Sequence, residues 1–224
     1  MKKLLYFLFT LPFLFSSCQE NKIDKELLEN ASKYYAYISS YTSGTISKRS
    51  KISIKMRTKV AEIPEGLLKF SPNIKGTLAL EKDSLTLTFI PEKDLKDGTL
   101  YNAKFKLNKL HPELTGDLKT FSFQFQTIKQ EFAYELLGYK PYNEKSLKYN
   151  KVLGKVETSD IVSPNELASF LEAKQGKIKL SIKWNSLTEH EHLFSIDSAI
   201  RNDEPVPVDM EFNAQQIGAG KDKS

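Results

Sequence analysis

Hydrophobic and polar residues alternate along much of this chain, most clearly between residues 70 and 101. Leu78 and Leu80 are followed, after a short polar segment, by Leu85, Leu87 and Phe89 at every second position. A period of two is typical of strands that bury one face. The polar residues 81–84 form a segment short enough for a tight reversal, so this stretch predicts a β-hairpin.

The same alternation recurs on both sides of this hairpin. The apolar positions are Ile52, Ile54 and Met56, then Ala103, Phe105 and Leu107, then Phe121, Phe123 and Phe125. Short strands separated by regular turn signals are typical of an antiparallel sandwich. We therefore expect residues 42–128 to form an antiparallel β-sandwich. The three alternating phenylalanines belong to its core rather than to a stacking platform for bases or sugars.

A second set of strands follows residue 129, with one helix among them. Ser163, Pro164 and Glu166 match a helix N-cap, a first helical residue and a capping box. Later alternating positions are Ile178, Leu180, Ile182 and Trp184, then His192, Phe194 and Ile196, then Val206, Val208, Met210 and Phe212. Residues 129–224 therefore predict a second β domain, and the glycine-rich, charged tail leaves open whether this domain is truncated.

Residues 1–17 have the features of a signal peptide. Lys2 and Lys3 precede an apolar run that is too short to span a bilayer as a permanent helix. The run ends in FSSC, which resembles the cleavage box of bacterial lipoproteins, although Phe15 stands where leucine is usual. We therefore expect Cys18 to be the lipidation site. The alternative is a plain secretory signal with an incidental cysteine.

Residues 18–41 are expected to tether the folded part to the lipid. A charged spacer follows Cys18. Leu27, Ala31, Tyr34 and Tyr35 then recur at intervals of three and four, which predicts a short amphipathic helix whose tyrosines pack on the first domain. The predicted fold class is therefore all-β: two tandem antiparallel β-sandwich domains, a short N-terminal helix and one helix in the second domain.

Composition narrows the functional classes. The chain is 40% hydrophobic and 27% charged, which is ordinary for a folded protein. Its net charge of +5 falls to about +3 without Lys2 and Lys3, which is too weak to indicate nucleic-acid binding. Cys18 is the only cysteine, so an internal disulfide and a cysteine-based metal site are both excluded.

Candidate catalytic or metal-binding residues are sparse. His190 and His192 would share one strand face and supply two metal ligands at best, and the alternative places them at the rim of a buried face. The remaining histidine, His111, precedes a proline. Glu81, Asp83 and Glu92 gather around the first hairpin, where a solvated face explains them better than acid–base chemistry. We therefore predict no catalytic residue, no metal, no cofactor and no enzymatic activity.

Several segments together resemble a known family. They are FSPNIKG at 70–76, LTFIP at 87–91, LKDGTLY at 95–101 and FSFQFQT at 121–127, with GKV at 154–156, Trp184 and FSIDSAIR at 194–201. The first four resemble the bacterial Ig-like domain near the start of bacterial α2-macroglobulins, and the others resemble the next module in the large α2-macroglobulin lipoproteins of Bacteroidota-type bacteria. The chain departs from the family in having no Cys-x-x-Gln thioester motif, since Cys18 is followed by QEN.

The resemblance implies the membrane-anchored N-terminal scaffold part of a cell-envelope proteinase inhibitor, without bait or thioester in this chain. The alternative is a small surface lipoprotein whose Ig-like domains act as a protein-interaction module or as a subunit of an envelope complex. Both hypotheses expect a lipid anchor in the cell envelope, at the outer membrane, and a protein partner or protease. Neither expects nucleic acid or a small-molecule substrate.

Overall fold

The computed structural model describes residues 31–143, 146–204 and 206–220. The predicted signal peptide, Cys18 and most of the predicted tether lie outside these residues. The described chain folds around two separate hydrophobic clusters, one built from residues 31–125 and one from residues 156–219. We call the surrounding parts the first module, residues 31–128, and the second module, residues 129–220.

The first module is a sandwich of two four-stranded sheets. One sheet has the order β1 (Ile38–Tyr41), β3 (Ile52–Met56), β6 (Thr86–Pro91), β5 (Gly76–Leu80). The other has the order β2 (Gly44–Ile46), β8 (Phe121–Thr127), β7 (Leu100–Phe105), β4 (Leu68–Ser71). The predicted hairpin is the pair of β5 and β6, with Leu78 opposite Phe89. The pairing of β2 with β8 is parallel, which departs from the antiparallel prediction.

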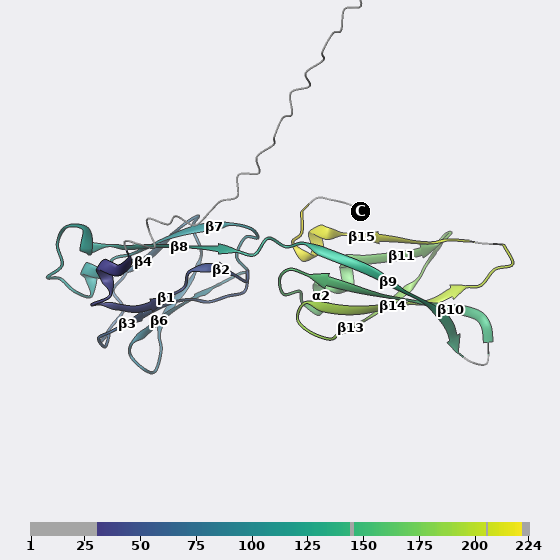
Figure 1. Ribbon diagram of the computed structural model, residues 1–224, viewed down its shortest axis with the longest axis horizontal. Coiled ribbons are helices and arrows are strands. Elements are labelled where there is room, and N and C mark those ends of the chain that lie inside the picture. Colours follow the sequence, from purple (N-terminus) through teal and green to yellow (C-terminus); the bar gives the residue numbers. More distant parts are fainter. Residues whose placement is uncertain (1–30, 144–145, 205, 221–224) are drawn as a thin grey trace, which may run out of the picture.

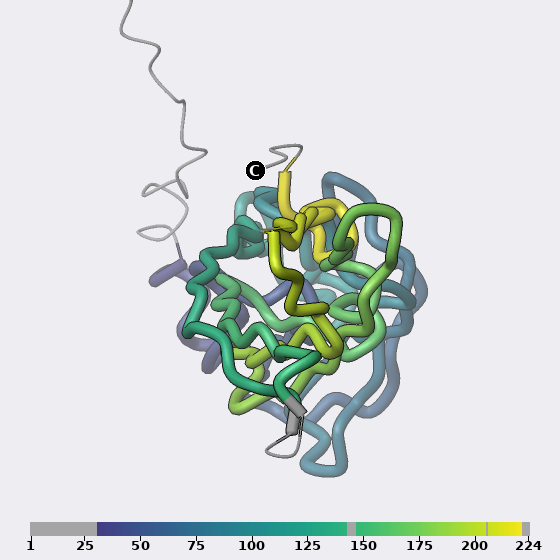
Figure 2. The backbone as a smooth tube through the Cα atoms, turned by 90° about the vertical axis from the view of Figure 1, so that its right-hand side faces the viewer, coloured from purple at the N-terminus to yellow at the C-terminus, as the bar shows by residue number. Residues whose placement is uncertain are grey.

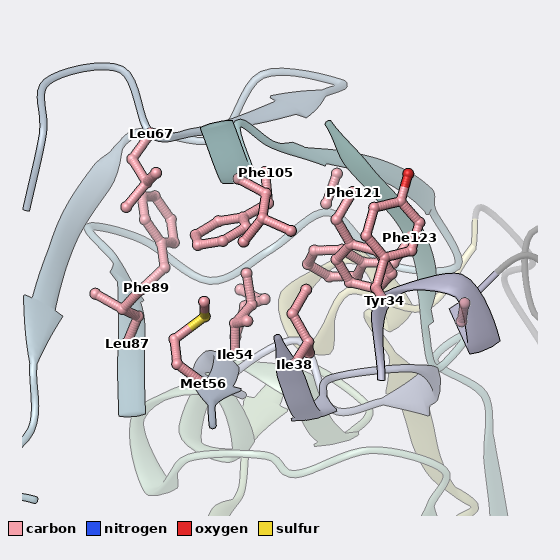
Figure 3. Close-up of a cluster of buried hydrophobic side chains, with 14 of the residues drawn as sticks. Tyr34, Ile38, Ile54, Met56, Leu67, Leu87, Phe89, Phe105, Phe121 and Phe123 are labelled. Carbon is pink, nitrogen blue, oxygen red and sulfur yellow. The ribbon is translucent and has the colours of Figure 1, made fainter. Parts of the chain in front are cut away.

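The inner faces of these sheets meet in an aromatic core (Figure 3). Phe105, Phe121 and Phe125 are fully buried, and Phe123 is nearly so. Burying one such side chain contributes about 1.5–3 kcal/mol, so the alternating phenylalanines of β8 are structural, as predicted. Tyr101 stacks on Phe125 with ring centroids 5.2 Å apart.

The predicted amphipathic helix is present only as a short turn in the described chain. A 3-10 helix spans Ala31–Tyr34, and Leu27 lies outside the described residues. Tyr34 packs on Phe121, and its hydroxyl donates hydrogen bonds to the carbonyls of Asp117 and Thr120. Tyr35 is 60% exposed, so only one of the two tyrosines packs on the module as expected.

The second module has two unequal sheets (Figure 1). The larger has the order β13 (Ser181–Ser186), β14 (Glu191–Ile200), β10 (Ser146–Thr158), β9 (Phe132–Asn143). The smaller has the order β12 (Ile178–Lys179), β11 (Leu171–Gln175), β15 (Val208–Phe212). The all-β sandwich prediction is thus confirmed. The α-helix α2 (Pro164–Phe170) begins with the predicted capping box of Ser163 and Glu166.

One strand prediction in this module is wrong. We expected Ile178, Leu180, Ile182 and Trp184 to share one face of a single strand. The chain instead leaves one sheet after Lys179 and enters the other at Ser181, so Ile178 is half exposed. Local alternation is unchanged by such a switch, because both short strands keep a period of two.

The modules follow each other along the long axis of the molecule, joined by the chain that runs from β8 into β9. Figure 2 looks along this axis, with the green and yellow second module in front of the blue first module. Loops of the first module, α2 and the 3-10 helix η4 (Ala214–Ile217) are brought together where the modules meet.

Candidate functional site between the two modules

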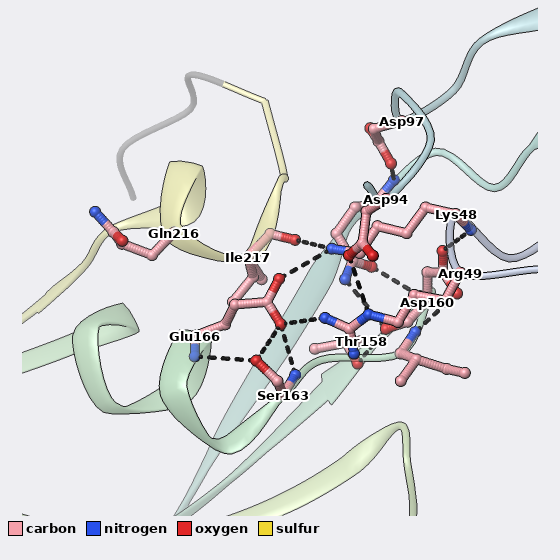
Figure 4. A network of polar contacts seen from close by, with 12 residues as sticks. Lys48, Arg49, Asp94, Asp97, Thr158, Asp160, Ser163, Glu166, Gln216 and Ile217 are labelled. Atoms are coloured by element: carbon pink, nitrogen blue, oxygen red, sulfur yellow. Dashed lines mark hydrogen bonds and ion pairs between the residues drawn. The ribbon is translucent and has the colours of Figure 1, made fainter. Parts of the chain in front are cut away.

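Lys48 lies in the loop between β2 and β3 and reaches into the second module (Figure 4). Its main-chain N–H donates to the Asp160 carboxylate at 2.8 Å. Its Nζ donates to Glu166 Oε1 and to the carbonyl of Ile217, each at 3.2 Å. The lysine is only 6% exposed, so its charge depends on these acceptors for the solvation it loses on burial.

Arg49 joins one carboxylate from each module. Its Nε contacts Asp94 Oδ2 at 3.0 Å in the first module, and its Nη2 contacts Glu166 Oε2 at 2.6 Å in the second. Guanidinium groups present several donors in a rigid plane, which suits this bridging position. Arg49 and Lys48 together therefore hold both oxygens of Glu166 from the first module.

Glu166 is positioned by its own helix before it meets these cations. As the third residue of α2 it accepts hydrogen bonds from the backbone and the hydroxyl of Ser163, each at 2.6 Å. Burial raises the pKa of Glu166, but the hydrogen bonds from Ser163, Arg49 and Lys48 outweigh it and lower the pKa to about 2. The carboxylate is therefore fully ionised at neutral pH.

Gln130 and Asp160 form a second pair of polar residues beside Glu166 and its cations. The Gln130 side chain donates to the Asp160 carbonyl at 3.1 Å and accepts from the Asp160 main-chain N–H at 2.7 Å. The Gln130 main-chain N–H donates to Asp97 Oδ1 at 2.6 Å. Burial raises the pKa of Asp97, opposed by this hydrogen bond. Both Gln130 and Asp160 are fully buried.

This arrangement is suited to holding two bodies in one orientation. Its ionised groups are paired with each other or with main-chain donors, and breaking such a buried pair is costly. The contacts join loops of the first module to the start of α2 and to η4. We call this set of Lys48, Arg49, Gln130, Asp160 and Glu166 the junction cluster.

The two histidines that were considered as metal ligands each bond a different protein group. His192 lies in β14, is 1% exposed and bonds Ser186 Oγ through Nδ1 at 2.7 Å. His190 lies in the preceding turn, with Nδ1 3.2 Å from the carbonyl of Thr158. Burial, and then the nearby His190, lowers the pKa of His192. No group of three potential metal-ligating side chains occurs in the described part of the chain.

The three carboxylates of the first hairpin are divided between its two ends. Asp83 closes the turn between β5 and β6 by accepting from the main-chain N–H groups of Leu85 and Thr86, each at 2.8 Å. Glu92 follows β6 at the opposite end of the hairpin, where its N–H donates to Lys75. Glu81 is exposed beside the turn. His111 bonds the exposed Glu113 at 3.2 Å.

The predicted lipidation site, Cys18, lies outside the described residues. No helix among residues 31–143, 146–204 and 206–220 is long and apolar enough to cross a membrane.

Sequence reasoning identified Ser163 and Glu166 as a helix cap but missed the rest of the junction cluster. Lys48 and Glu166 are 118 residues apart, and no local spacing relates them. Gln130 and Asp160 are 30 residues apart, and no local pattern marks them as partners either.

Comparison with known proteins gives no family assignment. No protein-family model matches the chain, and no curated protein matches its sequence. Among solved structures, an L,D-transpeptidase from Mycobacterium tuberculosis H37Rv is 10% identical with a TM-score of 0.32, and 74% of this chain and 75% of that chain are covered. A titin structure, Titin-A168169, is 9% identical with a TM-score of 0.26, covering 76% and 93%.

These matches correct one prediction. We expected a protein without enzymatic activity, whereas three of the matching solved structures are L,D-transpeptidases, which are enzymes. That expectation is therefore withdrawn. With TM-scores of 0.30 to 0.32, the matches transfer neither a reaction nor a catalytic residue to this chain.

Proposed function

We propose that this chain is the membrane-anchored N-terminal scaffold part of an α2-macroglobulin-like cell-envelope proteinase inhibitor. In this role its two modules act as a stiff spacer between the lipid on Cys18 and the parts that meet a protease. The junction cluster is the observation that supports the proposal. A spacer that holds the later parts of the protein at a set distance from the membrane needs a fixed angle between its modules.

The spacer role is tested by measuring the distance between the modules. Spin labels on Lys104→Cys in β7 and Lys177→Cys after β11 suit this purpose in a Cys18→Ala background, because both positions are exposed and lie in different modules. We expect one narrow distance distribution by pulsed electron spin resonance. Adding Lys48→Ala and Arg49→Ala should broaden it, since these residues connect the modules through Glu166.

A matched control removes a lysine outside the junction. Lys174→Ala in β11 takes away an exposed charge and should leave the distance distribution unchanged. A broad distribution in the labelled chain with its junction intact would contradict the spacer role. A junction variant that keeps the narrow distribution would contradict the claim that the junction cluster fixes the angle between the modules.

The anchor is tested by cell fractionation. Cys18→Ala should move the protein from the membrane fraction into the soluble fraction, because acyl chains on that cysteine supply the membrane affinity. Lys22→Ala, in the charged spacer after the cysteine, is the control that should stay with the membrane. Membrane association that survives Cys18→Ala would remove the lipoprotein part of the proposal.

The inhibitor part is tested on the natural protein. An antibody raised against the second module should detect, in membranes of the source organism, a polypeptide many times longer than 224 residues that carries further β modules and a bait segment. Detection of only a short lipoprotein, copurifying with a stoichiometric envelope protein, would favour the interaction-module alternative instead.

A further inference from the structure

The two sheets of the second module differ greatly in strand length. β9, β10 and β14 contain 12, 13 and 10 residues, whereas β11, β15 and β12 on the opposite side contain 5, 5 and 2. The inner face of the larger sheet therefore runs beyond the strands that should cover it. In a complete sandwich both inner faces are covered by side chains of the opposite sheet.

A pocket of about 740 Å³ lies where this cover ends. Its apolar lining includes Leu136, Tyr139, Pro141, Val152, Val206 and Val208, from β9, β10, β15 and the segment before β15. The volume is within the range of sites that bind small molecules. Leu136 is 51% exposed and Tyr139 is 79% exposed, which is unusual for inward-facing residues of a sandwich.

The wall of this pocket is held in place by a buried amide. Gln175 is 6% exposed, and its Nε2 donates to the carbonyls of Ile200 at 2.9 Å and Val206 at 3.1 Å. Its Oε1 accepts from the main-chain N–H of Ile200 at 2.7 Å. These bonds tie the ends of β11 and β14 to the segment before β15 and so fix the position of this wall.

The described residues that line the pocket include a positive charge but no negative one. Arg201 is the one charged residue among the described residues that line it, and no acidic residue is among them. Its main-chain N–H donates to the carbonyl of Lys148 at 2.9 Å, which fixes this residue at the end of β14. Asp203 and Glu204 follow in the same loop but do not line the pocket. An apolar body with a single anionic group complements this lining.

We propose that this pocket binds an amphipathic monocarboxylate, with its hydrocarbon chain between β9 and β15 and its carboxylate at Arg201. A peptide that pairs with β9 as an added strand is a less suitable occupant. β9 contains Pro141, which lacks an N–H, and its register shifts between the pairs Leu153–Gly138 and Gly154–Leu136. Both features interrupt the regular row of main-chain groups that an added strand needs.

The test uses dodecanoate and the full chain carrying Cys18→Ala, so that acyl groups on the protein do not compete. Titration calorimetry below the micellar concentration should give saturable binding with one site per chain. Dodecyltrimethylammonium, which has the same chain length and the opposite charge, should bind at least tenfold more weakly. Equal binding of the two probes would overturn the role of Arg201.

Variants locate the site. Arg201→Glu should weaken dodecanoate binding at least tenfold, and Leu136→Asp should abolish it. Both residues are exposed, so the fold should survive, which circular dichroism checks. Lys177→Glu and Leu147→Asp are the matched controls, because Lys177 is an exposed cation and Leu147 an exposed leucine, both outside the pocket, and both variants should bind normally.

Three results would overturn the proposal. The first is no saturable binding of dodecanoate. The second is binding that the two pocket variants leave unchanged, which would place the ligand elsewhere. The third is saturable binding of an alternating Val-Thr hexapeptide with none of dodecanoate, which would make the surface a peptide groove.

Discussion

The main-chain N–H of Lys48 donates a hydrogen bond to the carboxylate of Asp160, 112 residues later in the chain, at 2.8 Å. The same carboxylate accepts from the main-chain N–H of Ile161, also at 2.8 Å. A loop of the first module and the segment before α2 in the second module are thus fixed by one buried side chain. The two modules are therefore coupled through main-chain groups as well as through the ion pairs of Lys48 and Arg49 with Glu166.

Asp160→Ala should destabilise the chain by about 2–4 kcal/mol, because it leaves two main-chain donors in a buried site without an acceptor. Urea unfolding followed by circular dichroism measures the change. We expect the variant to unfold in two separate steps, one for each module. Asp209→Ala removes an exposed carboxylate from β15 and should change stability by less than about 0.5 kcal/mol. A single transition with unchanged midpoint in Asp160→Ala would contradict the coupling.

Glu166 should make the chain sensitive to acid. Its pKa is lowered from 4.5 to about 2 in the folded chain, so the unfolded chain binds a proton more readily. The stabilisation is complete above pH 4.5 and is lost as the pH falls towards 2. The shift corresponds to stability on the order of 3 kcal/mol. Urea midpoints measured between pH 6 and pH 2.5 report this loss.

The matched variants for this pH dependence are Glu166→Gln and Glu62→Gln. Glu166→Gln should be less stable at pH 6 and should show a flatter pH profile, because the group that titrates is gone. Glu62 is exposed, and Glu62→Gln should keep the profile of the unchanged chain. Parallel profiles for Glu166→Gln and the unchanged chain would show that another group causes the acid sensitivity.

Local pattern was sufficient to predict the parts of the fold that depend on neighbouring residues. The β5–β6 hairpin follows from alternation on both sides of a polar turn, and Asp83 closes that turn with local hydrogen bonds. The capping box of Ser163 and Glu166 likewise depends on residues three apart. These features are formed by interactions within a few residues, so they are readable from a single sequence.

The remaining features depend on partners that are distant in the sequence. Alternation from Ile178 to Trp184 could not show that the chain changes sheets near Leu180, because the period is the same in both. The long strand β9 was missed because its register shift beside Gly138 interrupts the alternation. The junction cluster and the pocket beside Arg201 arise only when the modules and sheets are assembled.

Gly154 should tolerate no side chain. It lies opposite Phe194 in the β10–β14 pairing, and a Cβ at this position would come within 2.2 Å of the Phe194 ring. Gly154→Ala should therefore destabilise the second module by about 1–3 kcal/mol, through displacement of a buried aromatic ring. Thermal unfolding measures the change. Gly220→Ala, where a Cβ meets open space, is the matched control, and equal melting temperatures for the two variants would contradict the steric argument.

His192 should make the stability of the second module depend on pH near neutrality. Its ring is buried, and burial lowers its pKa below the ordinary value of 6.5. The unfolded chain therefore takes up a proton at a higher pH than the folded chain, so stability is lost as the pH falls below 6.5. Trp184, the only tryptophan, lies in β13 beside β14, and its fluorescence reports unfolding of this module.

Urea midpoints followed by Trp184 fluorescence at pH 7.5, 6.5 and 5.5 should fall with the pH in the unchanged chain. His192→Leu should flatten this dependence while lowering stability at pH 7.5, because Ser186 loses its hydrogen-bond partner. His111→Gln, in the first module, should leave the dependence measured at Trp184 intact. If His192→Leu and His111→Gln give the same slope of midpoint against pH, protonation of the buried ring is not what destabilises the module in mild acid.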